Sequence, residues 1–230
     1  MNDLDRIQRE VDARIEAVIF DCDGVVVDSV RESHQAIVDA LGARGHALSL
    51  DECKARFLGQ PLTSVIAYAA DLDLPSGATL KDDIESRYMV IAKGKLRVMP
   101  GAMVMVGSLA TRALIALAAS SSQKKTRFTL SEVGFSGAFG VVVTSDDVSK
   151  PKPAPDAILL CAKRLGVDPT RVLYVDDAPV GIEAARACGA MAIGHSGTVG
   201  REALEAAGAD FVVDSLQTLR TILRHKGRTS

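Results

Sequence analysis

The sequence predicts a doubly wound α/β fold, in which helices cover both faces of a parallel sheet. Short apolar runs of strand length alternate with segments whose apolar residues recur every three to four positions, as repeated βαβ units require. The expected strands are Ala17 to Phe20, Leu114 to Ala119, Gly140 to Val143, Val172 to Val175, Met191 to Ile193 and Phe211 to Val213. A chain of 230 residues can hold such a domain and one insertion.

Apolar residues at helical spacing predict the connecting helices. A leading amphipathic helix is expected over residues 4 to 16, and crossover helices over Ala154 to Leu165 and Val180 to Cys188. The tail after about His225 lacks this pattern, so we expect it to fray.

One long stretch, residues 29–98, breaks the alternation because its pattern is helical throughout. Its expected helices are Ser33 to Leu41, Leu50 to Phe57, Pro61 to Ala70 and Leu80 to Ala92. We therefore divide the chain into a core of residues 1–28 and 99–230 and an inserted helical domain of residues 29–98. Met99 to Gly101 forms the expected return into the core.

Composition and charge are those of a globular protein. The chain is 47% apolar and 24% charged, and its net charge of -2 gives no reason to expect nucleic acid or an anionic membrane as a partner. Its first residues are acidic and charged, unlike a secretory signal, and no apolar run approaches the length of a membrane span. We expect a cytoplasmic monomer or homodimer.

The cysteines and histidines show no spacing typical of a metal site. Each of the four cysteines and four histidines stands alone in the sequence, so we expect reduced thiols and structural imidazoles. These residues are Cys22, Cys53, Cys161, Cys188, His34, His46, His195 and His225.

The segment AVIFDCDGVVVDS carries the strongest chemical signal. Asp21 and Asp23 stand at alternate positions directly after an apolar strand, so their carboxylates should leave the strand end as neighbours. One carboxylate can act as a nucleophile or metal ligand and the other as a proton donor. Cys22 should point the opposite way, as a buried bystander. The alternative is an ordinary acidic turn that caps the next helix.

Three further segments follow in the order and spacing that a single phosphoryl-transfer site requires. They are an apolar run that ends in hydroxyls (ALIALAASSS, residues 113–122), KPKPAPD with Lys152, and RVLYVDDAPVG with Asp176 and Asp177. With the first segment they resemble the four signature motifs of the haloacid dehalogenase (HAD) superfamily of phosphohydrolases, over nearly the whole chain. The resemblance implies a Rossmann-like core, an α-helical cap at residues 29–98 and a phosphoaspartate intermediate.

The acidic residues predict a magnesium site. Two carboxylates about 5 Å apart repel each other by about 3 kcal/mol at an effective dielectric near 20, so a cluster of them needs a cation. Oxygen ligands suit Mg²⁺, which also neutralises charge on a transferring phosphoryl group. The resemblance implies that Asp21 binds through its carboxylate, Asp23 through its backbone carbonyl, and one or both of Asp176 and Asp177 directly or through water, with Asp177 favoured.

The resemblance also implies the catalytic roles. Asp21 is the nucleophile, ionised at neutral pH as a free carboxylate would be. Asp23 is the general acid and base, with a pKa expected to be raised by nearby anions and burial. Lys152 orients Asp21 and balances the phosphate charge; Lys150 is its rival, but the KPxPD pattern matches Lys152 to Asp156.

The predicted phosphate cradle combines hydroxyls with backbone amides. Ser120, the first residue after the apolar run, is expected to bind the phosphoryl oxygens; Ser121 points to the opposite side if the strand continues, and Ser122 is a loop alternative. The backbone amides of Cys22, Asp23 and Ser121 should complete the cradle, and Gly24 is a further binding candidate in the same turn.

A second anionic group of the substrate has its own candidates. Arg56 is the first, and the basic run Lys93, Lys95 and Arg97 is the second, against the alternative of a solvated basic face.

The resemblance is closest to small phosphatases and mutases that include phosphoglycolate phosphatase and β-phosphoglucomutase. Leu58, Leu62 and Ser33 stand where the mutase pattern would have a lysine, an arginine and a histidine, and His34 follows one position late. We therefore predict a Mg²⁺-dependent phosphatase of a small phosphorylated metabolite, a sugar or sugar-acid phosphate. The alternatives are a β-phosphoglucomutase-like phosphomutase and a non-catalytic HAD-like binding protein.

Overall fold

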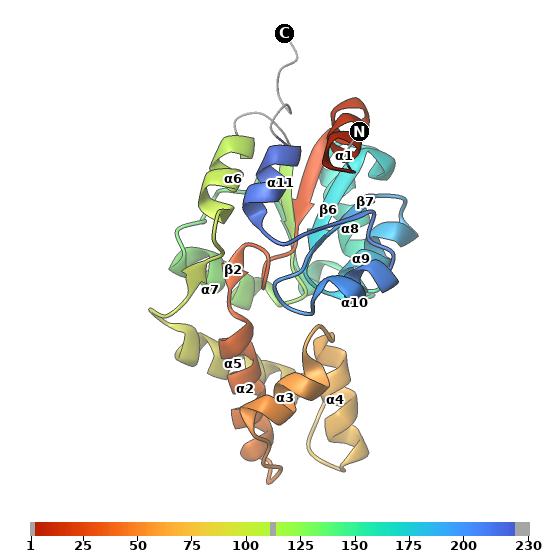
Figure 1. The fold of residues 1–230 in the computed structure, drawn as a ribbon. Helices are drawn as coiled ribbons and strands as arrows, with labels where there is room; N and C mark the ends of the chain where they lie inside the picture. The colour runs from red at the N-terminus through yellow and green to blue at the C-terminus, as the bar shows by residue number, and fades with distance from the viewer. Residues whose placement is uncertain (1–2, 111–113, 224–230) are drawn as a thin grey trace.

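A computed structural model describes residues 3–110 and 114–223. Within these residues, six parallel strands form one sheet in the order β5-β4-β1-β6-β7-β8 (Figure 1). The strands are β1 (Ala17–Phe20), β4 (Leu114–Ala118), β5 (Val141–Val143), β6 (Val172–Asp176), β7 (Met191–His195) and β8 (Phe211–Val213). The predicted doubly wound α/β class and its strands are confirmed. Ala113 and the tail after about His225 lie outside the described residues.

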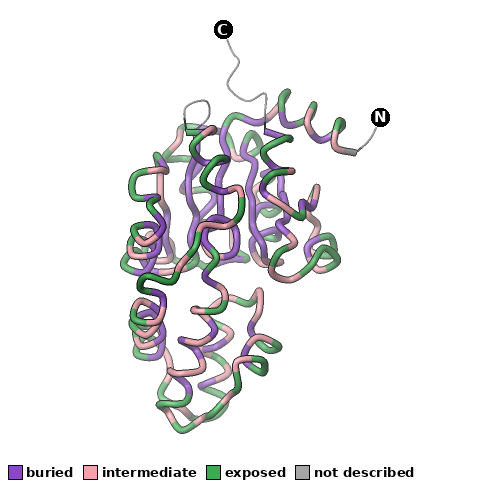
Figure 2. The backbone as a smooth tube through the Cα atoms, turned by 60° about the vertical axis from the view of Figure 1, so that its left-hand side comes forward, coloured by how far each residue is buried: buried purple, intermediate pink, exposed green. Residues whose placement is uncertain are grey.

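Helices cover both faces of this sheet. One apolar cluster joins the sheet to α1 (Asp3–Arg14), α6 (Ala102–Ala110), α7 (Gln123–Glu132) and α11 (Leu216–Ile222). A second joins it to α8 (Asp156–Leu165), α9 (Pro179–Ala187) and α10 (Arg201–Ala206). The 3₁₀ turns Ser145–Asp147 and Pro169–Arg171 complete the core. Buried residues follow the strands in Figure 2.

The strand β1 shows why a fully apolar run suits this position. Its side chains alternate between the two faces, with Val18 and Phe20 in the first cluster and Ala17 and Ile19 in the second. Because helices cover both faces, no position on the strand is left for a polar residue.

A helical insertion, α2 to α5, follows β1 and packs at the carboxyl end of the sheet (Figure 1). Its helices are α2 (Val30–Gly42), α3 (Leu50–Phe57), α4 (Leu62–Asp71) and α5 (Ala78–Ala92). They enclose their own apolar cluster, in which Leu80 and Tyr88 are fully buried. The four predicted helices are confirmed in the structure.

A short antiparallel pair, β2 (Val27–Asp28) with β3 (Arg97–Val98), closes the base of the insertion. The sequence analysis missed this pair because two residues are too few to show an alternating pattern. The pair ties the beginning and the end of the insertion together where the chain leaves and re-enters the core.

The insertion also touches the core on two opposite sides. On one side, the amide of Gly94 donates to Glu132 Oε2 at 2.6 Å. On the other, the backbone at Gly59 lies so near Val199 that a Cβ would come within 2.7 Å of its Cγ1. The structure is therefore a closed form. Among the described residues, no helix is long and apolar enough to cross a membrane.

The register of the central strands positions the site. Phe20 at the end of β1 pairs with Leu117 of β4 and Val175 of β6, so the residues that follow these strands emerge at one edge. The chain proceeds from β1 to β4 and β5 on one side and later to β6, β7 and β8 on the other. Ligands of open α/β sheets bind at such a switch point.

Removing the Phe20 ring tests the packing of the central strand. Phe20 is fully buried and meets Phe139 edge to face, with ring centroids 6.3 Å apart. We expect Phe20→Ala to lower the free energy of unfolding by about 3 to 5 kcal/mol, because a cavity replaces the ring. Urea unfolding measures this loss. Val90→Ala, at a side chain that is 79% exposed, should change stability little, and a comparable loss in both variants would contradict the prediction.

Candidate active site

Three carboxylates meet at the carboxyl ends of β1 and β6. Asp21, Asp176 and Asp177 are buried, and each offers an oxygen within 4.8 Å of the others. Asp21 follows β1 directly and Asp176 is the last residue of β6, so the pairing of these strands brings them together. With Asp23 and Lys152 they line one cavity of about 190 Å³ beneath the insertion.

Lys152 supplies the cation at the centre of this cluster. Its Nζ lies 2.6 Å from Asp21 Oδ1 and 2.9 Å from Asp176 Oδ2. Burial alone would lower the pKa of Lys152, but the carboxylates of Asp176 and Asp21 outweigh it and raise the pKa. Lys150, the rival candidate, is exposed, and the structure brings Lys152 to the cluster.

One ammonium group does not balance this many buried carboxylates. Burial, partly offset by Lys152 and reinforced by Asp176, raises the pKa of Asp21 to about 7. Burial and Asp176 also raise the pKa of Asp177 well above its usual value. The sequence analysis assigned Asp21 an ordinary pKa near 4, which is wrong for this surrounding. A divalent cation with a preference for oxygen fits this donor set and would restore the ionised forms.

The two acidic residues of the DD pair differ in their partners. Asp176 accepts hydrogen bonds from Lys152, from the Tyr174 hydroxyl at 2.6 Å and from the Ala178 amide at 2.9 Å. Asp177 accepts one from the Thr198 hydroxyl. Asp177 therefore retains more lone pairs for a cation.

Gly24 holds the turn between β1 and β2 close to this pair. Its φ of +79° suits glycine, and a Cβ there would overlap the Asp177 carboxylate. Its amide donates to the carbonyl of Val27 at 2.8 Å, and its carbonyl accepts from His195 Nδ1 at 3.2 Å. Because the turn uses the Gly24 amide, that amide is not free for phosphate, and the phosphate contact expected of Gly24 stays a prediction. The structure shows that the residue permits a close approach of backbone to carboxylate.

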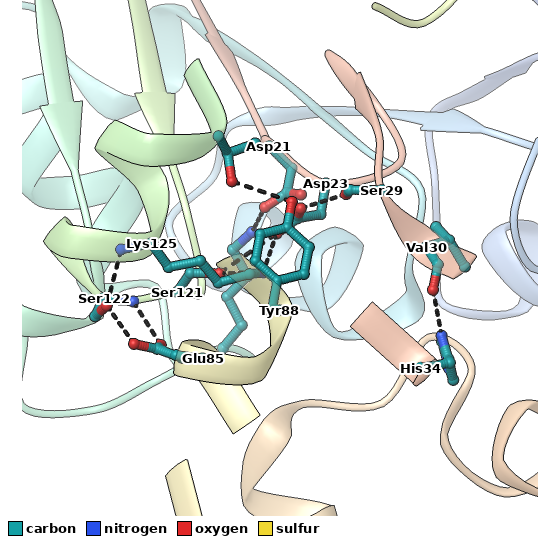
Figure 3. A network of polar contacts seen from close by, with 12 residues as sticks. Asp21, Asp23, Ser29, Val30, His34, Glu85, Tyr88, Ser121, Ser122 and Lys125 are labelled. Atoms are coloured by element: carbon teal, nitrogen blue, oxygen red, sulfur yellow. Dashed lines mark hydrogen bonds and ion pairs between the residues drawn. The ribbon is translucent and has the colours of Figure 1, made fainter. Parts of the chain in front are cut away.

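Asp23 lies beside the cluster and is held at both oxygens (Figure 3). The Ser29 hydroxyl donates to Oδ1, while Lys125 Nζ and Ser121 Oγ lie 2.9 Å and 3.3 Å from Oδ2. Burial opposes ionisation, but Lys125 and these hydroxyls together hold the pKa of Asp23 below its usual value. The prediction of a raised pKa is therefore wrong for this form, because the sequence analysis did not assign Lys125 to the site.

Lys125 is the site residue that sequence reasoning missed. It lies in the first turn of α7, which begins after Ser122, and its side chain is buried. One signal was available: a lysine in the first turn of a helix opposes the helix dipole, so another interaction must favour it there.

The serines after β4 divide between the cavity and the helix start. Ser120 and Ser121 both line the cavity. The condition under which Ser121 would face away is not met, because β4 ends at Ala118 and strand alternation does not extend to the serines. Ser122 accepts from the Lys125 amide as the cap of α7 and donates to Glu85 of α5, so its hydroxyl is engaged elsewhere.

This geometry agrees with a known protein family. A family model for haloacid dehalogenase-like hydrolases matches residues 15–189. The chain belongs to this family. Fructose-1-phosphate phosphatase YqaB of Escherichia coli is 32% identical over 185 residues, and the match covers 78% of this chain and 96% of that protein. N-acetylmuramic acid 6-phosphate phosphatase of Pseudomonas aeruginosa is 29% identical, with 91% of this chain and 95% of that protein covered.

A solved HAD family hydrolase from Deinococcus radiodurans has the same fold. It carries bound phosphate and sodium, matches this chain with a TM-score of 0.72 and 29% identity, and the match covers 94% of this chain and 97% of that one. These similarities confirm the resemblance that the motifs predicted and the reaction class, a HAD phosphatase.

The basic candidates of the HAD insertion lie away from the cavity. Arg56 is exposed, and its guanidinium carbon lies 4.6 Å from the centroid of the Tyr68 ring. Arg56 does not line the cavity, because Phe57 occupies the buried face of α3 and the adjacent residue points about 100° away from that face. The substrate contact expected of Arg56 stays a prediction. The basic run is also exposed, which agrees with the alternative of a solvated basic face; its residues are Lys93, Lys95 and Arg97.

The insertion contributes a mixed wall to the cavity. The apolar residues include Ile37, Leu58 and Leu62, and the polar ones include Ser33 and His34 of α2. His34 Nδ1 donates to the Val30 carbonyl at 2.7 Å (Figure 3), and burial lowers the pKa of His34. Among the described residues, Ser33 Oγ and His34 Nε2 are buried without a hydrogen-bond partner. Such atoms call for a partner from outside the chain.

The carboxylate cluster predicts how magnesium changes stability with pH. In the unfolded chain Asp21 and Asp177 titrate near 4, whereas both pKa values are raised in the folded protein. Stability from Asp21 is present below about pH 4 and lost as the pH rises through about 7, and stability from Asp177 is lost in the same direction. Mg²⁺ favours the ionised carboxylates, so it should stabilise most at the higher pH.

The measurement is the difference in Tm between samples with Mg²⁺ and with EDTA. We expect this difference to widen from about pH 5 to about pH 8. Asp177→Asn should raise the Tm of the metal-free protein at the higher pH, because it removes one of the repelling carboxylates, and should shrink the effect of Mg²⁺. A difference that narrows as the pH rises would contradict the prediction.

Proposed function

We propose that this phosphatase hydrolyses a sugar or sugar-acid phosphate, with Mg²⁺, through a phosphoaspartate on Asp21. The observation that carries the proposal is the buried cluster of Asp21, Asp176, Asp177 and Lys152 at the floor of a cavity with polar and apolar walls. Two relatives act, by their names, on fructose 1-phosphate and on N-acetylmuramic acid 6-phosphate. Their substrates support a phosphorylated sugar here.

The metal ligands follow from the free lone pairs of the cluster. Asp21 and Asp177 would bind the ion through their carboxylates, and Asp23 through its backbone carbonyl. Asp176 would not bind the ion directly, because its carboxylate already accepts three hydrogen bonds. When bound, Mg²⁺ neutralises charge on the cluster and on the transferring phosphoryl group.

The side chains of this chain carry out the two chemical steps. An Asp21 oxygen attacks phosphorus while the bond to the leaving oxygen breaks. Asp23, which Lys125 keeps ionised in the free protein, must take up a proton when the phosphate anion binds beside it, and it then gives that proton to the leaving oxygen. Asp23, now a carboxylate, takes a proton from the water that attacks the phosphoaspartate, which releases inorganic phosphate and regenerates Asp21. Lys152 keeps Asp21 oriented, and the Ser120 hydroxyl would bind the phosphate from the cavity wall, beside a Ser121 hydroxyl that is hydrogen-bonded to Asp23 and Lys125.

The helical insertion, residues 29–98, serves as the cap over this reaction. Its closed position covers the cavity and limits water to the molecules that the second step needs. Ser33 and His34 offer a hydroxyl and an unprotonated Nε2 to the organic part of the substrate. A sugar supplies hydroxyl groups that can donate to one and accept from the other.

The cavity wall favours a hydrolase over a mutase. Leu58 and Leu62, at the positions where the mutase pattern would have a lysine and an arginine, line the cavity as apolar groups. They cannot hold the second phosphate of a bisphosphate intermediate. Lys152 is paired with Asp21 and so can hold this nucleophile in place. A protein that only binds its ligand would not need that arrangement.

A screen of phosphorylated metabolites tests the proposal, and Asp21→Asn tests its mechanism. We expect one mole of inorganic phosphate per mole of sugar phosphate consumed, no interconversion of β-glucose 1-phosphate and glucose 6-phosphate, and loss of turnover in EDTA that Mg²⁺ restores. Asp21→Asn keeps the shape of the side chain but removes the attacking charge, so turnover should cease.

Asp28→Asn is the matched control, because Asp28 is exposed on β2. It should retain turnover, and circular dichroism should show that both variants are folded. Substantial phosphate release by folded Asp21→Asn protein would exclude the covalent mechanism, and isomerisation without phosphate release would establish a mutase.

The unpartnered groups of α2 predict a defect in substrate binding. We expect Ser33→Ala and His34→Leu each to raise KM for the sugar phosphate by roughly tenfold, the value of about one hydrogen bond to a buried group. Inhibition by inorganic phosphate, which reaches only the core side of the cavity, should stay nearly constant. Steady-state kinetics measures both quantities, and an equal effect on both would contradict a role in recognising the sugar.

A further inference from the structure

Lys125 is a buried ammonium group between the acid/base candidate and the helical insertion. Its Nζ lies 2.9 Å from Asp23 Oδ2 and 2.9 Å from Ser121 Oγ. The same Nζ lies 4.3 Å from the centroid of the Tyr88 ring, which belongs to α5 of the insertion. Figure 3 shows Lys125 and Tyr88 side by side next to Asp23. The ammonium is therefore in contact with both parts of the protein.

Two helix faces form this contact. On α7, Lys125 and Thr129 are one turn apart, and Ser122 caps the helix start. On α5, Glu85 accepts from the Ser122 amide at 3.0 Å, and Tyr88 OH lies 3.1 Å from Thr129 Oγ1. The insertion thus meets the segment that carries Lys125 at three successive points.

The orientation of the Asp23 carboxylate depends on Lys125. Ser29 holds Oδ1, but Oδ2 has the ammonium at 2.9 Å and the Ser121 hydroxyl only at 3.3 Å. Without the ammonium, that oxygen keeps one long hydrogen bond and the side chain gains rotational freedom. A proton donor must sit within hydrogen-bond reach of the leaving oxygen, so this freedom would slow the transfer.

We propose that Lys125 is a positioning residue that fixes Asp23 for proton transfer, and that the Tyr88 ring of the insertion holds Lys125 in that place. The insertion then completes the acid/base arrangement when it closes, as well as covering the substrate. This inference rests on the proposed function, since it requires Asp23 to protonate a leaving group.

An alternative is that Lys125 binds the phosphate itself. The two roles differ in their dependence on the leaving group. A phosphate ligand would affect every phosphate ester alike, whereas a residue that positions the proton donor matters for an alkoxide leaving group and little for p-nitrophenolate, which leaves without a proton. The ratio kcat/KM isolates this step, because it reports events up to the first irreversible one.

The experiment compares a sugar phosphate with p-nitrophenyl phosphate in Lys125→Met and in Lys124→Met. Lys124 is the exposed neighbour on α7 and should leave both substrates unchanged. We expect Lys125→Met to lower kcat/KM by about 30-fold or more for the sugar phosphate and less than about threefold for p-nitrophenyl phosphate, a part of the usual contribution of general acid catalysis. Lys125→Arg, which keeps the charge, should recover part of the loss.

Tyr88→Leu tests the contribution of the insertion. The substitution removes the ring that faces the ammonium group of Lys125. We expect it to lower kcat/KM for the sugar phosphate more than for p-nitrophenyl phosphate, but by a smaller factor than Lys125→Met does. Combined with Lys125→Met it should add little, because both changes act on one interaction. If thermal unfolding shows that Lys125→Met does not fold, Lys125→Gln and Tyr88→Leu give the same comparison of substrates.

Three outcomes would overturn the inference. Equal losses for both substrates would assign Lys125 to phosphate binding, and unchanged kinetics would leave it without a role in the reaction. If Tyr88→Leu acts independently of Lys125→Met, the link to the insertion fails. Failure of the wild-type protein to release phosphate from either ester would instead overturn the proposed function, and this inference with it.

Discussion

The rest of the structure depends on bringing buried carboxylates together against their mutual repulsion. Asp21, Asp176 and Asp177 approach within 4.8 Å because β1 and β6 are neighbours in a parallel sheet. Two glycines make room for them: a Cβ at Gly24 would overlap Asp177, and one at Gly181 would overlap Asp176. Lys152 compensates part of the negative charge. The uncompensated remainder is the physical reason for the divalent cation that we propose, since a phosphate substrate is itself an anion and adds to the repulsion.

The helical insertion contributes to the site unevenly. On the α5 side it makes polar contacts with α7 through Glu85 and Tyr88. On the α3 to α4 side its close approach is the backbone of Gly59 against the apolar side chain of Val199. Polar contacts are directional and costly to break in a buried place, whereas an apolar contact separates and re-forms more easily. The directional contacts between the insertion and the core therefore include those on the α5 side, around Lys125.

The sequence predicted the strands and the acidic cluster because both rest on local patterns. Apolar runs mark buried strands, and Asp21 and Asp176 directly follow or end such runs. The sequence analysis was wrong where a property of one residue depends on a segment far away in the chain. The pKa of Asp23 depends on Lys125, which lies 102 positions away. That contact leaves no signal in the local sequence. The directions of Ser121 and Arg56 instead depend on the exact end of β4 and on the rotation of α3 about its axis, which a shift of one residue changes.

The two lysine–carboxylate pairs of the site differ in the way that their proposed tasks require. A nucleophile must stay unprotonated and fixed, and Asp21 meets Lys152 at 2.6 Å with its side chain only 10% exposed. An acid/base group must exchange its proton with a leaving oxygen and with water. Asp23 meets Lys125 at 2.9 Å with its side chain 29% exposed. The more open carboxylate of Asp23 can be reached by water and by a leaving oxygen, although Lys125 holds its pKa below the usual value. The same kind of ion pair thus encloses one aspartate and leaves the other accessible to the groups with which it would exchange protons.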